Sequence, residues 1–393
     1  MAIASQLDGP VVQNVDPANP LRIMLVDDSA VIRGMLHRWL SVDPECKIVG
    51  SYNNGQQAVR HVKSCGAEIV ILDIEMPEMD GLTALPLLIR EVPNIQVLMA
   101  STLTRRNADI SLRALSMGAV DYLPKPESAS KGSTPAEFQR DLLFKVKSIG
   151  AAMRGGRHAL QPSTRPFTAA ALRGGVVSPA ASFKSATATK SVVLRAPSKR
   201  RPDILAIGSS TGGPQALFTL LKDLKDSLRI PVVITQHMPP TFTAILAEHI
   251  QTLTGIPARE AAEGDLLRNG EILIAPGNYH MTVIRKGADR VAHLDQKPQV
   301  NFCRPAVDPL FESIASIYGA TALAVILTGM GHDGREGGRK LVDAGGTIFV
   351  QDEKSSVVWG MPGAVAEAGL CSAVIPLTDM GHHIKRFLQG GAA

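Results

Sequence analysis

The hydrophobic and polar positions of residues 21–145 repeat one pattern, in which a short apolar run is followed by apolar residues at helical spacing. The apolar runs are LRIMLV, AEIVIL, IQVLMA and AVDYL. Short apolar runs predict buried strands, and their alternation with helices predicts parallel strands with helices on both faces. We therefore predict a doubly wound α/β domain over residues 21–145.

The same pattern returns after residue 203. The apolar runs are now DILAIG, PVVITQ, EILIAPG, ALAVILTG and TIFVQ, and helical stretches such as PPTFTAILAEHIQTL separate them. This predicts a second parallel sheet with helices on both faces, a three-layer α/β/α domain over residues 203–393. In such sheets, functional residues collect beyond the carboxyl ends of the strands.

The segment over residues 146–202 differs from both domains in composition. It is rich in Ala, Ser, Thr, Pro and Gly, and its residues 151–202 contain ten Lys or Arg but no Asp or Glu. The net charge of the whole chain is +5, so the residues outside 151–202 have a net charge of −5. We expect a flexible, solvated basic linker, and the alternative is a weak contact with an acidic partner or nucleic acid.

Composition narrows the class of protein further. The chain is 45% hydrophobic but has no apolar run near 18 residues, which predicts no membrane insertion. Residues 1–20 lack a basic start and an apolar signal core, so we expect a disordered leader and a cytoplasmic protein. The four cysteines are scattered without a CxxC pair, which favours reduced thiols over disulfides or a zinc site.

Charged and hydroxyl side chains follow the strands of the first domain. Asp27 and Asp28 end one strand, Asp73 and Ser101 end two others, and Lys125 follows a fourth. Any one aspartate alone would be a turn or cap residue, but together these residues meet at one sheet edge. Three carboxylates there repel one another unless a divalent cation such as Mg²⁺ neutralises them. The lysine and the serine could then bind phosphoryl oxygens.

The strands of the second domain deliver a different set. DILAIG ends on Ser209 and Ser210, PVVITQ is followed by His237, and ALAVILTG is followed by Asp333 within GMGHDG. If the strands are parallel, a serine, a histidine and an aspartate meet at one edge. A serine hydroxyl needs a histidine to take its proton and a carboxylate to orient that histidine, so this set indicates nucleophilic acyl transfer.

Other interpretations of these residues stay open at this point. The GSSTGG turn could hold a phosphate, although it matches neither GxGxxG nor GxxxxGK[ST] and has no lysine; it is also not a GxSxG elbow. Asp333 could be a helix cap. His249, His280 and His332 are rivals of His237 for the general base.

The motifs VDDS, DIEMPEMDG and KP resemble the receiver domain of response regulators, a flavodoxin-like fold, across residues 21–145. The resemblance implies that Asp73 accepts a phosphoryl group. It implies that Asp28, Asp73 and the Glu75 carbonyl hold Mg²⁺, with Asp27 assisting through water. It also implies that Ser101 and Tyr122 are the switch residues and that Lys125 belongs to the same site.

The motifs IGSSTGGPQAL, ITQHMPP, NFCRPAVDPLFESIA, VILTGMGHDGREG and WGMPGAVAEAG resemble the catalytic domain of the chemotaxis protein-glutamate methylesterase (CheB) family. A receiver in front of that domain is the family's architecture. The resemblance implies a Ser210 nucleophile, a His237 base and an orienting Asp333. The Met330 backbone N–H would be an oxyanion donor, and Ser209 would be a spectator.

This resemblance implies a phosphorylation-activated hydrolase that cleaves glutamate methyl esters on chemoreceptors and deamidates glutamine. It implies Mg²⁺ for the receiver and no cofactor for ester hydrolysis. The expected partners are methyl-accepting chemoreceptors and a chemotaxis histidine kinase, and we expect a monomer that binds no nucleic acid. Two alternatives are a response regulator whose second domain binds DNA and a catalytically inactive, phosphorylation-controlled binding module.

Overall fold

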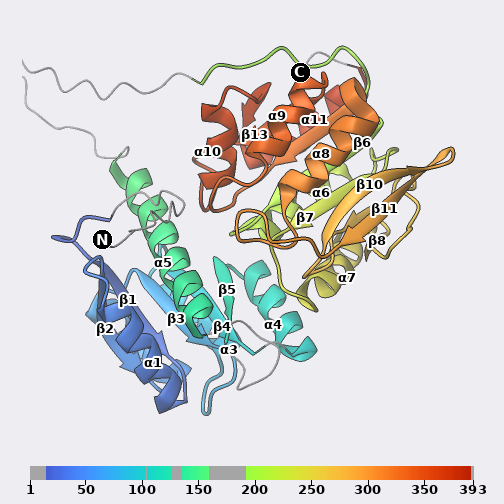
Figure 1. Ribbon diagram of the computed structural model, residues 1–393. Coiled ribbons are helices and arrows are strands. Elements are labelled where there is room, and N and C mark those ends of the chain that lie inside the picture. Colours follow the sequence, from blue (N-terminus) through green and yellow to red (C-terminus); the bar gives the residue numbers. More distant parts are fainter. Residues whose placement is uncertain (1–14, 103, 126–134, 159–191, 391–393) are drawn as a thin grey trace, which may run out of the picture.

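The computed structural model describes residues 15–102, 104–125, 135–158 and 192–390, which build two parallel α/β sheets with their helices (Figure 1). Residues 1–14 of the expected leader and residues 159–191 of the expected linker lie outside the described residues. Val15, in the remaining part of the expected leader, is buried in the core of the first domain.

The first sheet has five strands in the order β2-β1-β3-β4-β5, and every neighbouring pair is parallel. Its strands are β1 (Leu21–Val26), β2 (Cys46–Tyr52), β3 (Ile69–Asp73), β4 (Gln96–Ser101) and β5 (Asp121–Pro124). Its helices are α1 (Ala30–Ser41), α2 (Gly55–Cys65), α3 (Gly81–Glu91), α4 (Arg105–Ser116) and α5 (Pro135–His158). The predicted doubly wound fold is confirmed.

Short polar side chains cap the first turns of the helices that follow the strands. The Ser29 hydroxyl accepts the Ile32 N–H at the start of α1, and the Asp80 carboxylate accepts the Thr83 N–H at 2.7 Å at the start of α3. Such caps satisfy backbone donors that the first helical turn leaves unpaired. The helices therefore begin close to the sheet edge where the strands end.

Helix α5 continues beyond residue 145, at which composition places the end of the first domain. Ile149 is 1% exposed, and the Arg154 guanidinium donates to the Glu68 carboxylate at 2.6 Å. The composition of this segment does not reveal the helix because tertiary contacts hold it: one buried face and the ion pairs of Lys147 and Arg154 with carboxylates of the first domain. The structure thus differs from the expected start of the linker.

The second sheet has seven strands in the order β14-β13-β12-β6-β7-β9-β8, again all parallel. Its strands are β6 (Ile204–Ser209), β7 (Val232–Gln236), β8 (Ala258–Glu260), β9 (Ile272–Ile274), β12 (Ala322–Ile326), β13 (Thr347–Gln351) and β14 (Ala373–Ile375). A separate antiparallel hairpin joins β10 (His280–Lys286) and β11 (Asp289–Asp295).

Helices cover both faces of this sheet, as predicted. They are α6 (Gly213–Leu224), α7 (Phe242–Thr254), α8 (Val307–Tyr318), α9 (Arg335–Asp343), α10 (Gly360–Glu367) and α11 (Leu377–Leu388), with a short 3₁₀ helix η1 (Gly319–Thr321). Side chains of α6, α7 and α11 form the core on one face, and those of α8, α9 and α10 form it on the other. Because β6 lies between β12 and β7, the strand order reverses there, which is where open α/β sheets bind ligands.

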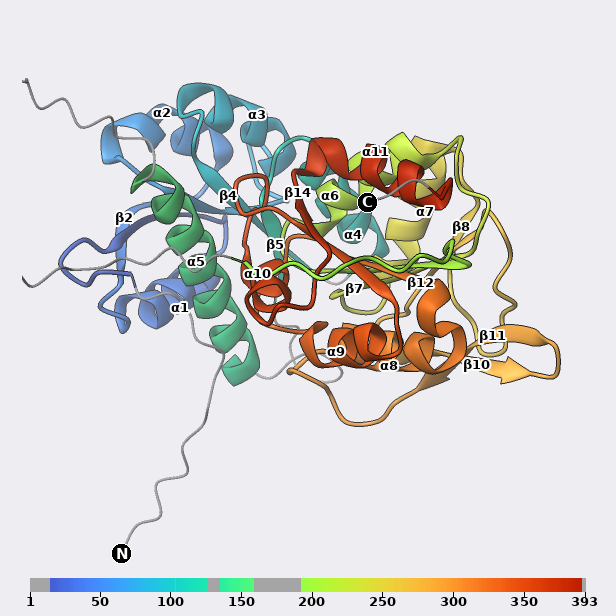
Figure 2. The ribbon, with the colours of Figure 1, turned by 90° about the horizontal axis from the view of Figure 1, so that it is seen from above.

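The two domains pack against each other through β5 and α4 of the first and α6 and α7 of the second (Figures 1 and 2). The Tyr122 ring stacks on the Phe242 ring with 4.4 Å between centroids. The Gln215 amide donates to the Ala119 carbonyl at 2.6 Å and also to the Leu115 carbonyl. One buried apolar cluster includes side chains from both sheets. The first domain is therefore docked close to the loops that follow β6 and β7.

Residues 192–202 run extended along the second domain. The Arg195 N–H donates to the Cys371 carbonyl at 2.9 Å, and the Ser198 N–H donates to the Thr347 hydroxyl at 2.8 Å. Among the helices of the described ranges, none is long and apolar enough to cross a membrane.

Candidate active site and phosphoacceptor site

The two serines after β6 have different surroundings. Ser209 is fully buried, and its hydroxyl donates to the Gln236 side-chain carbonyl at 2.6 Å. Ser210 is half-buried, and its own backbone groups make its hydrogen bonds: its N–H donates to the Thr328 carbonyl at 3.1 Å, and its carbonyl accepts the Gln236 side-chain amide at 2.8 Å. The Ser209 hydroxyl is thus occupied by a buried hydrogen bond to Gln236, whereas the Ser210 hydroxyl is available to react with a substrate.

The glycines of this turn are required by close packing. Gly212 has a φ of 75°, a left-handed conformation that favours glycine. A Cβ on Gly213 would lie 2.0 Å from the Gln236 side-chain oxygen, and a Cβ on Gly329 would lie 3.0 Å from the Ser210 Cβ. The glycine pair lets the chain turn sharply beside β7 and β12, which accounts for it without a bound phosphate.

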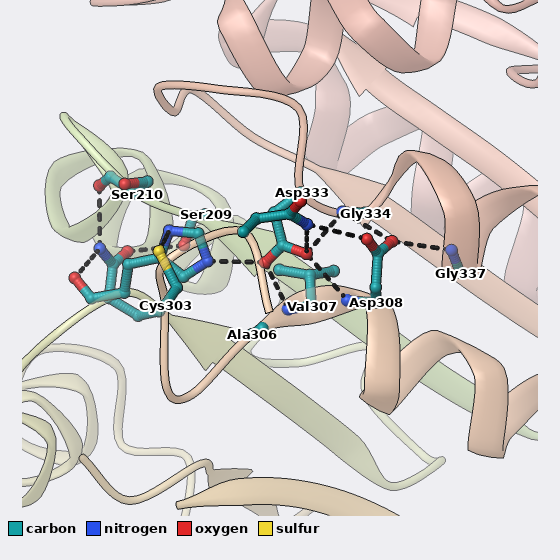
Figure 3. A network of polar contacts seen from close by, with 12 residues as sticks. Ser209, Ser210, Cys303, Ala306, Val307, Asp308, Asp333, Gly334 and Gly337 are labelled. Atoms are coloured by element: carbon teal, nitrogen blue, oxygen red, sulfur yellow. Dashed lines mark hydrogen bonds and ion pairs between the residues drawn. The ribbon is translucent and has the colours of Figure 1, made fainter. Parts of the chain in front are cut away.

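His237 and Asp333 form a direct pair at the carboxyl edge of the second sheet. Figure 3 shows Asp333 beside Asp308 and Gly334. His237 Nε2 lies 2.7 Å from Asp333 Oδ2, and both side chains are largely buried. Burial alone would raise the pKa of the Asp333 carboxyl, but the hydrogen bond and charge of His237 and backbone donors outweigh it and lower this pKa. Asp333 therefore stays charged and orients the imidazole.

The Asp333 carboxylate also caps the start of α8, and a second aspartate, Asp308, caps the start of α9. The Asp333 carboxylate accepts the Val307 N–H at 2.6 Å and the Asp308 N–H at 3.1 Å, at the start of α8. The Asp308 carboxylate accepts the Gly334 N–H at 3.0 Å and the Gly337 N–H at 2.7 Å, at the start of α9. Asp308, in the first turn of α8, thus caps α9, and Asp333, in the loop just before α9, caps α8. The helix-cap interpretation of Asp333 therefore holds together with its contact to His237.

Cys303 contacts the other nitrogen of the imidazole, and sequence reasoning missed it. Its Sγ lies 3.4 Å from His237 Nδ1. Burial disfavours the charged imidazole, but the charge interaction with Cys303 and the hydrogen bond with Asp333 outweigh it and raise the pKa of His237 to about 10. The cysteine lies within the NFCRPAVD motif, but its sequence offers no signal of this contact because β7 and this loop meet only in the fold.

The Ser210 hydroxyl does not bond to the imidazole in this structure: within the described ranges, no hydrogen bond joins it to His237. Catalytic hydrogen bonds are often loose without substrate and tighten on binding. The strand ends nevertheless lie together, since the His237 N–H donates to the Ser209 carbonyl at 3.1 Å.

The rival histidines have other partners or none. His280 is buried, with Nε2 3.1 Å from the Pro298 carbonyl and Nδ1 accepting the Ala306 N–H at 3.2 Å. His249 Nε2 lies 2.8 Å from the Asp109 carboxylate of the first domain. His332 is half-buried; its backbone carbonyl accepts the Arg335 N–H at 3.2 Å, but its imidazole makes no hydrogen bond within the described part of the chain. Only His237 combines a buried carboxylate partner with a place beside the serine turn.

Met330 lies in the loop after β12, between two glycines. Its side chain packs against the core of the first domain. Its backbone N–H donates to no group in the described part of the chain, whereas the adjacent Gly329 N–H donates to the Val358 carbonyl at 3.0 Å. A free N–H at this edge is the kind of donor that an oxyanion hole requires.

The carboxyl edge of the first sheet gathers the expected acidic cluster. Carboxylate oxygens of Asp27, Asp28 and Asp73 lie within 4.8 Å of one another. Lys125 Nζ lies 2.7 Å from both Asp27 Oδ2 and Asp73 Oδ1. Burial raises the pKa of Asp73 to about 6, against the lowering effect of Lys125. Three carboxylates facing one ammonium leave an excess of negative charge and oxygen ligands, which fits Mg²⁺.

The remaining predicted receiver residues lie around this cluster. The Ser101 hydroxyl, at the end of β4, accepts the Ser111 hydroxyl at 3.0 Å. Tyr122 is buried at the domain interface rather than exposed. The Glu75 side chain is exposed and lies 4.0 Å from the Arg106 guanidinium.

Two family models match the chain: the response regulator receiver domain over residues 23–134 and the CheB methylesterase over residues 205–384. The chain is 51% identical to protein-glutamate methylesterase/protein-glutamine glutaminase 1 of Rhodospirillum rubrum, covering 93% of this chain and 95% of that one. It is 49% identical to protein-glutamate methylesterase/protein-glutamine glutaminase of Azospirillum brasilense, covering 95% and 94%.

Among solved structures, the Thermotoga maritima CheB methylesterase catalytic domain is 36% identical, with a TM-score of 0.46, covering 48% of this chain and 99% of that one. The response regulator domain of Thermotoga maritima CheB is 35% identical, with a TM-score of 0.30, covering 33% and 95%. Near-complete coverage at about half identity by full-length relatives is decisive: this chain belongs to the protein-glutamate methylesterase/protein-glutamine glutaminase family, with a receiver domain and a CheB methylesterase domain.

Proposed function

We propose that this protein is a phosphorylation-activated protein-glutamate methylesterase. Its substrates would be glutamate methyl esters on chemoreceptors, from which it releases methanol. The single observation that carries the proposal is the buried His237–Asp333 pair, 2.7 Å apart, at the switch point of the second sheet beside the half-buried Ser210. The names of the relatives supply the substrate class.

In the proposed reaction, the Ser210 hydroxyl attacks the ester carbonyl carbon while His237 takes its proton. Asp333 holds the Nε2 side of the imidazole, so the lone pair at Nδ1 is the one that accepts this proton. The nitrogen contacts Cys303 in the resting enzyme, and the Ser210 hydroxyl would replace that contact when substrate binds.

The tetrahedral intermediate carries a negative oxygen, and the free Met330 N–H would donate to it. His237 then gives its proton to the methoxide leaving group, and methanol departs. Water, activated by the same imidazole, hydrolyses the glutamyl-serine ester and restores Ser210. With a glutamine side chain the leaving group is ammonia, so the same site would also deamidate. No step needs a metal or an organic cofactor.

The first domain would control this chemistry through phosphorylation of Asp73. Asp28, Asp73 and the carbonyl of Glu75 would hold Mg²⁺, with Asp27 assisting through water, and the cation would supply positive charge for the phosphoryl oxygens. Lys125 and Ser101 would bind the same oxygens. A chemotaxis histidine kinase would be the phosphodonor, and we expect a monomer in the cytoplasm.

In the resting protein the first domain would restrict access to Ser210. The Thr211 hydroxyl, next to Ser210, donates to the Asp121 carboxylate at 2.8 Å, and Tyr122 stacks on Phe242. Phosphorylation would move Ser101 and Tyr122 and loosen this interface. A tenfold gain in open population needs only about 1.4 kcal/mol.

The test is methanol release from methylated receptor by the wild type, Ser210→Ala and Ser209→Ala. We expect Ser210→Ala to lose all measurable hydrolysis and Ser209→Ala to keep most of it, because the Ser209 hydroxyl is committed to Gln236. Activity that survives in Ser210→Ala would overturn the triad. If the fragment over residues 203–393 is no faster than the unphosphorylated chain, simple occlusion is wrong.

A further inference from the structure

The loop between β11 and α8 contains a tight turn over residues 300–303. Its ends are joined twice: the Cys303 N–H donates to the Val300 carbonyl at 2.9 Å, and the Val300 N–H donates to the Cys303 carbonyl at 3.1 Å. The two central residues, Asn301 and Phe302, have φ values of 52° and 62°. Phenylalanine rarely adopts this left-handed conformation, and such strain concentrates at functional sites.

The turn aims the Asn301 side chain at two buried carboxylates. Its single NH₂ group donates to Asp308 Oδ2 at 3.0 Å and to Asp333 Oδ1 at 3.1 Å. Asp308 is 5% exposed and Asp333 is 1% exposed, so water cannot easily replace either bond. An NH₂ group has two hydrogens, and this one gives one to each carboxylate.

The bond to Oδ1 fixes how the Asp333 carboxylate is rotated. Asn301, the Asp308 N–H and the Gly334 N–H all donate to Oδ1, at 3.0 to 3.1 Å. Oδ2 is left for His237 and for the Val307 N–H. Removing one of the Oδ1 donors weakens the preference for the orientation in which Oδ2 meets the imidazole.

The same NH₂ group also separates two like charges. Burial and the nearby Asp333 raise the pKa of Asp308 to about 7, which reflects the cost of placing both carboxylates together. A donor shared between the two offsets that cost. Asp308 in turn holds the start of α9, the helix that follows the Asp333 loop.

We propose that Asn301 is a positioning residue for the reaction: by bridging Asp308 and Asp333 it keeps Asp333 Oδ2 directed at His237. This inference rests on the proposed triad and adds a residue to it. Asn301 touches no reacting atom; it acts through Asp333. The titratable groups in contact with this network are Asp308, Asp333, His237 and, through His237, Cys303.

The experiment compares three variants of the full chain in steady-state methanol release. Asn301→Gly removes the amide but keeps a residue suited to φ 52°. Asn278→Gly is the matched control, because Asn278 also has a left-handed φ of 68° and bonds Arg304 instead of the triad. Ser210→Ala tests the triad itself.

We expect Asn301→Gly to lower kcat at least about tenfold, with KM within about twofold, because misorientation of a catalytic group acts on the chemical step. We expect Asn278→Gly to stay within about twofold of the wild type. A wild-type kcat in Asn301→Gly, or an equal loss in Asn278→Gly, overturns the inference. If Ser210→Ala is active, the proposed function fails instead, whatever Asn301→Gly does.

Asn301→Asp separates positioning from mere folding. A neutral carboxyl can donate to one neighbour, whereas a carboxylate cannot donate at all and adds a third negative charge. We therefore expect the ratio of kcat in Asn301→Asp to kcat in Asn301→Gly to fall as the pH rises. If Asn301→Gly has a lower melting temperature than Asn278→Gly, its loss of activity alone does not separate positioning from folding, and the pH dependence of the kcat ratio does. A kcat ratio that does not change with pH overturns the inference.

Discussion

Both domains place a buried aspartate at the carboxyl edge of a parallel sheet, yet burial and hydrogen bonding shift the pKa values of the two carboxyls in opposite directions. Asp73 ends β3 and has its pKa raised to about 6 by burial, whereas the pKa of Asp333 is lowered. The difference lies in the donors. Asp333 accepts hydrogen bonds from His237, Asn301 and three backbone N–H groups.

Asp73 has fewer compensating groups: Lys125, which it shares with Asp27, and the Ile74 N–H at 2.8 Å. An aspartate with many fixed donors is suited to remain charged and orient a neighbour. One with few donors beside other carboxylates is suited to bind a cation and change its own charge by chemistry. Sheet position alone does not assign the role; the donors supplied by neighbouring loops do.

The largest expected effect is on the catalytic rate and comes from substituting Asp333, the carboxylate with many hydrogen-bond donors. We expect Asp333→Asn to lower kcat by about 10⁴-fold, because the amide cannot hold the imidazole in the correct tautomer or stabilise its charged form. Steady-state methanol release measures this. Asp343→Asn, an exposed aspartate at the end of α9, is the control and should be near wild type. A loss below tenfold in Asp333→Asn would remove the contrast with Asp73.

The second largest expected effect is on protein stability and comes from Asp73, the carboxylate with few hydrogen-bond donors. The folded pKa of Asp73, about 6, lies above its ordinary value of 3.8, so the folded state binds the proton more tightly. Its contribution to stability is therefore present below about pH 4 and lost as the pH rises through about 6.

Asp73→Asn does not titrate, so its free energy of unfolding should rise relative to the wild type by about 2 kcal/mol between about pH 4.5 and about pH 7.5. Urea unfolding of both proteins across this range measures the difference. Glu91→Gln, at an exposed position in α3, is the control and should show no such trend. A flat difference for Asp73→Asn would mean that Lys125 already compensates the carboxylate.

The third expected effect is on the pKa of His237, the proposed general base that Asp333 orients. Cys303 is the largest of the causes that raise the pKa of His237, so Cys303→Ala should lower that pKa. A base must be neutral to accept a proton, so the acid limb of the kcat/KM profile should move to lower pH. At a pH on this limb, each unit of movement raises the rate about tenfold. Cys65→Ala, in α2, should leave the profile in place; a limb that moves upward in Cys303→Ala would contradict the assignment.

The smallest expected effect is on the rate of the unphosphorylated enzyme and comes from weakening the contact between the two domains. Gln215→Ala removes two hydrogen bonds from α6 to the first domain without touching the triad. Net hydrogen bonds are worth about 1 kcal/mol, so we expect the unphosphorylated rate to rise severalfold while the phosphorylated rate stays constant. Thr219→Ala, an exposed residue of α6, is the control. An unchanged resting rate would argue that this contact does not hold the closed state.

The sequence predicted the strands that carry chemistry, because short apolar runs ending in polar residues are a local signal. The aspartates of the first edge and His237 with Asp333 were brought together as expected. The β10–β11 hairpin, the extension of α5 and the contacts of Cys303 were not anticipated. These depend on packing between distant segments.

Asn301 and Asp308 show the same limit at one turn. Their bonds to Asp333 join a loop to residues about thirty positions further along the chain, and no local periodicity reports them. The left-handed conformation of Phe302 is likewise set by the surrounding fold, since its sequence favours an extended backbone. Local patterns thus located the strand ends but not the groups that support them.

The crossed helix caps affect how changes at Asp333 are to be interpreted in other members of this family. Because its carboxylate anchors the start of α8 while Asp308 anchors α9, a chain that had lost esterase activity and kept only a regulated binding role would still need an acceptor there. Retention of this aspartate is therefore weak support for catalysis. The Ser210 hydroxyl makes no hydrogen bond within the described residues, since the Gln236 side chain bonds only to the Ser210 backbone carbonyl. Loss of that hydroxyl would be the more telling sign that the enzyme has become a switch alone.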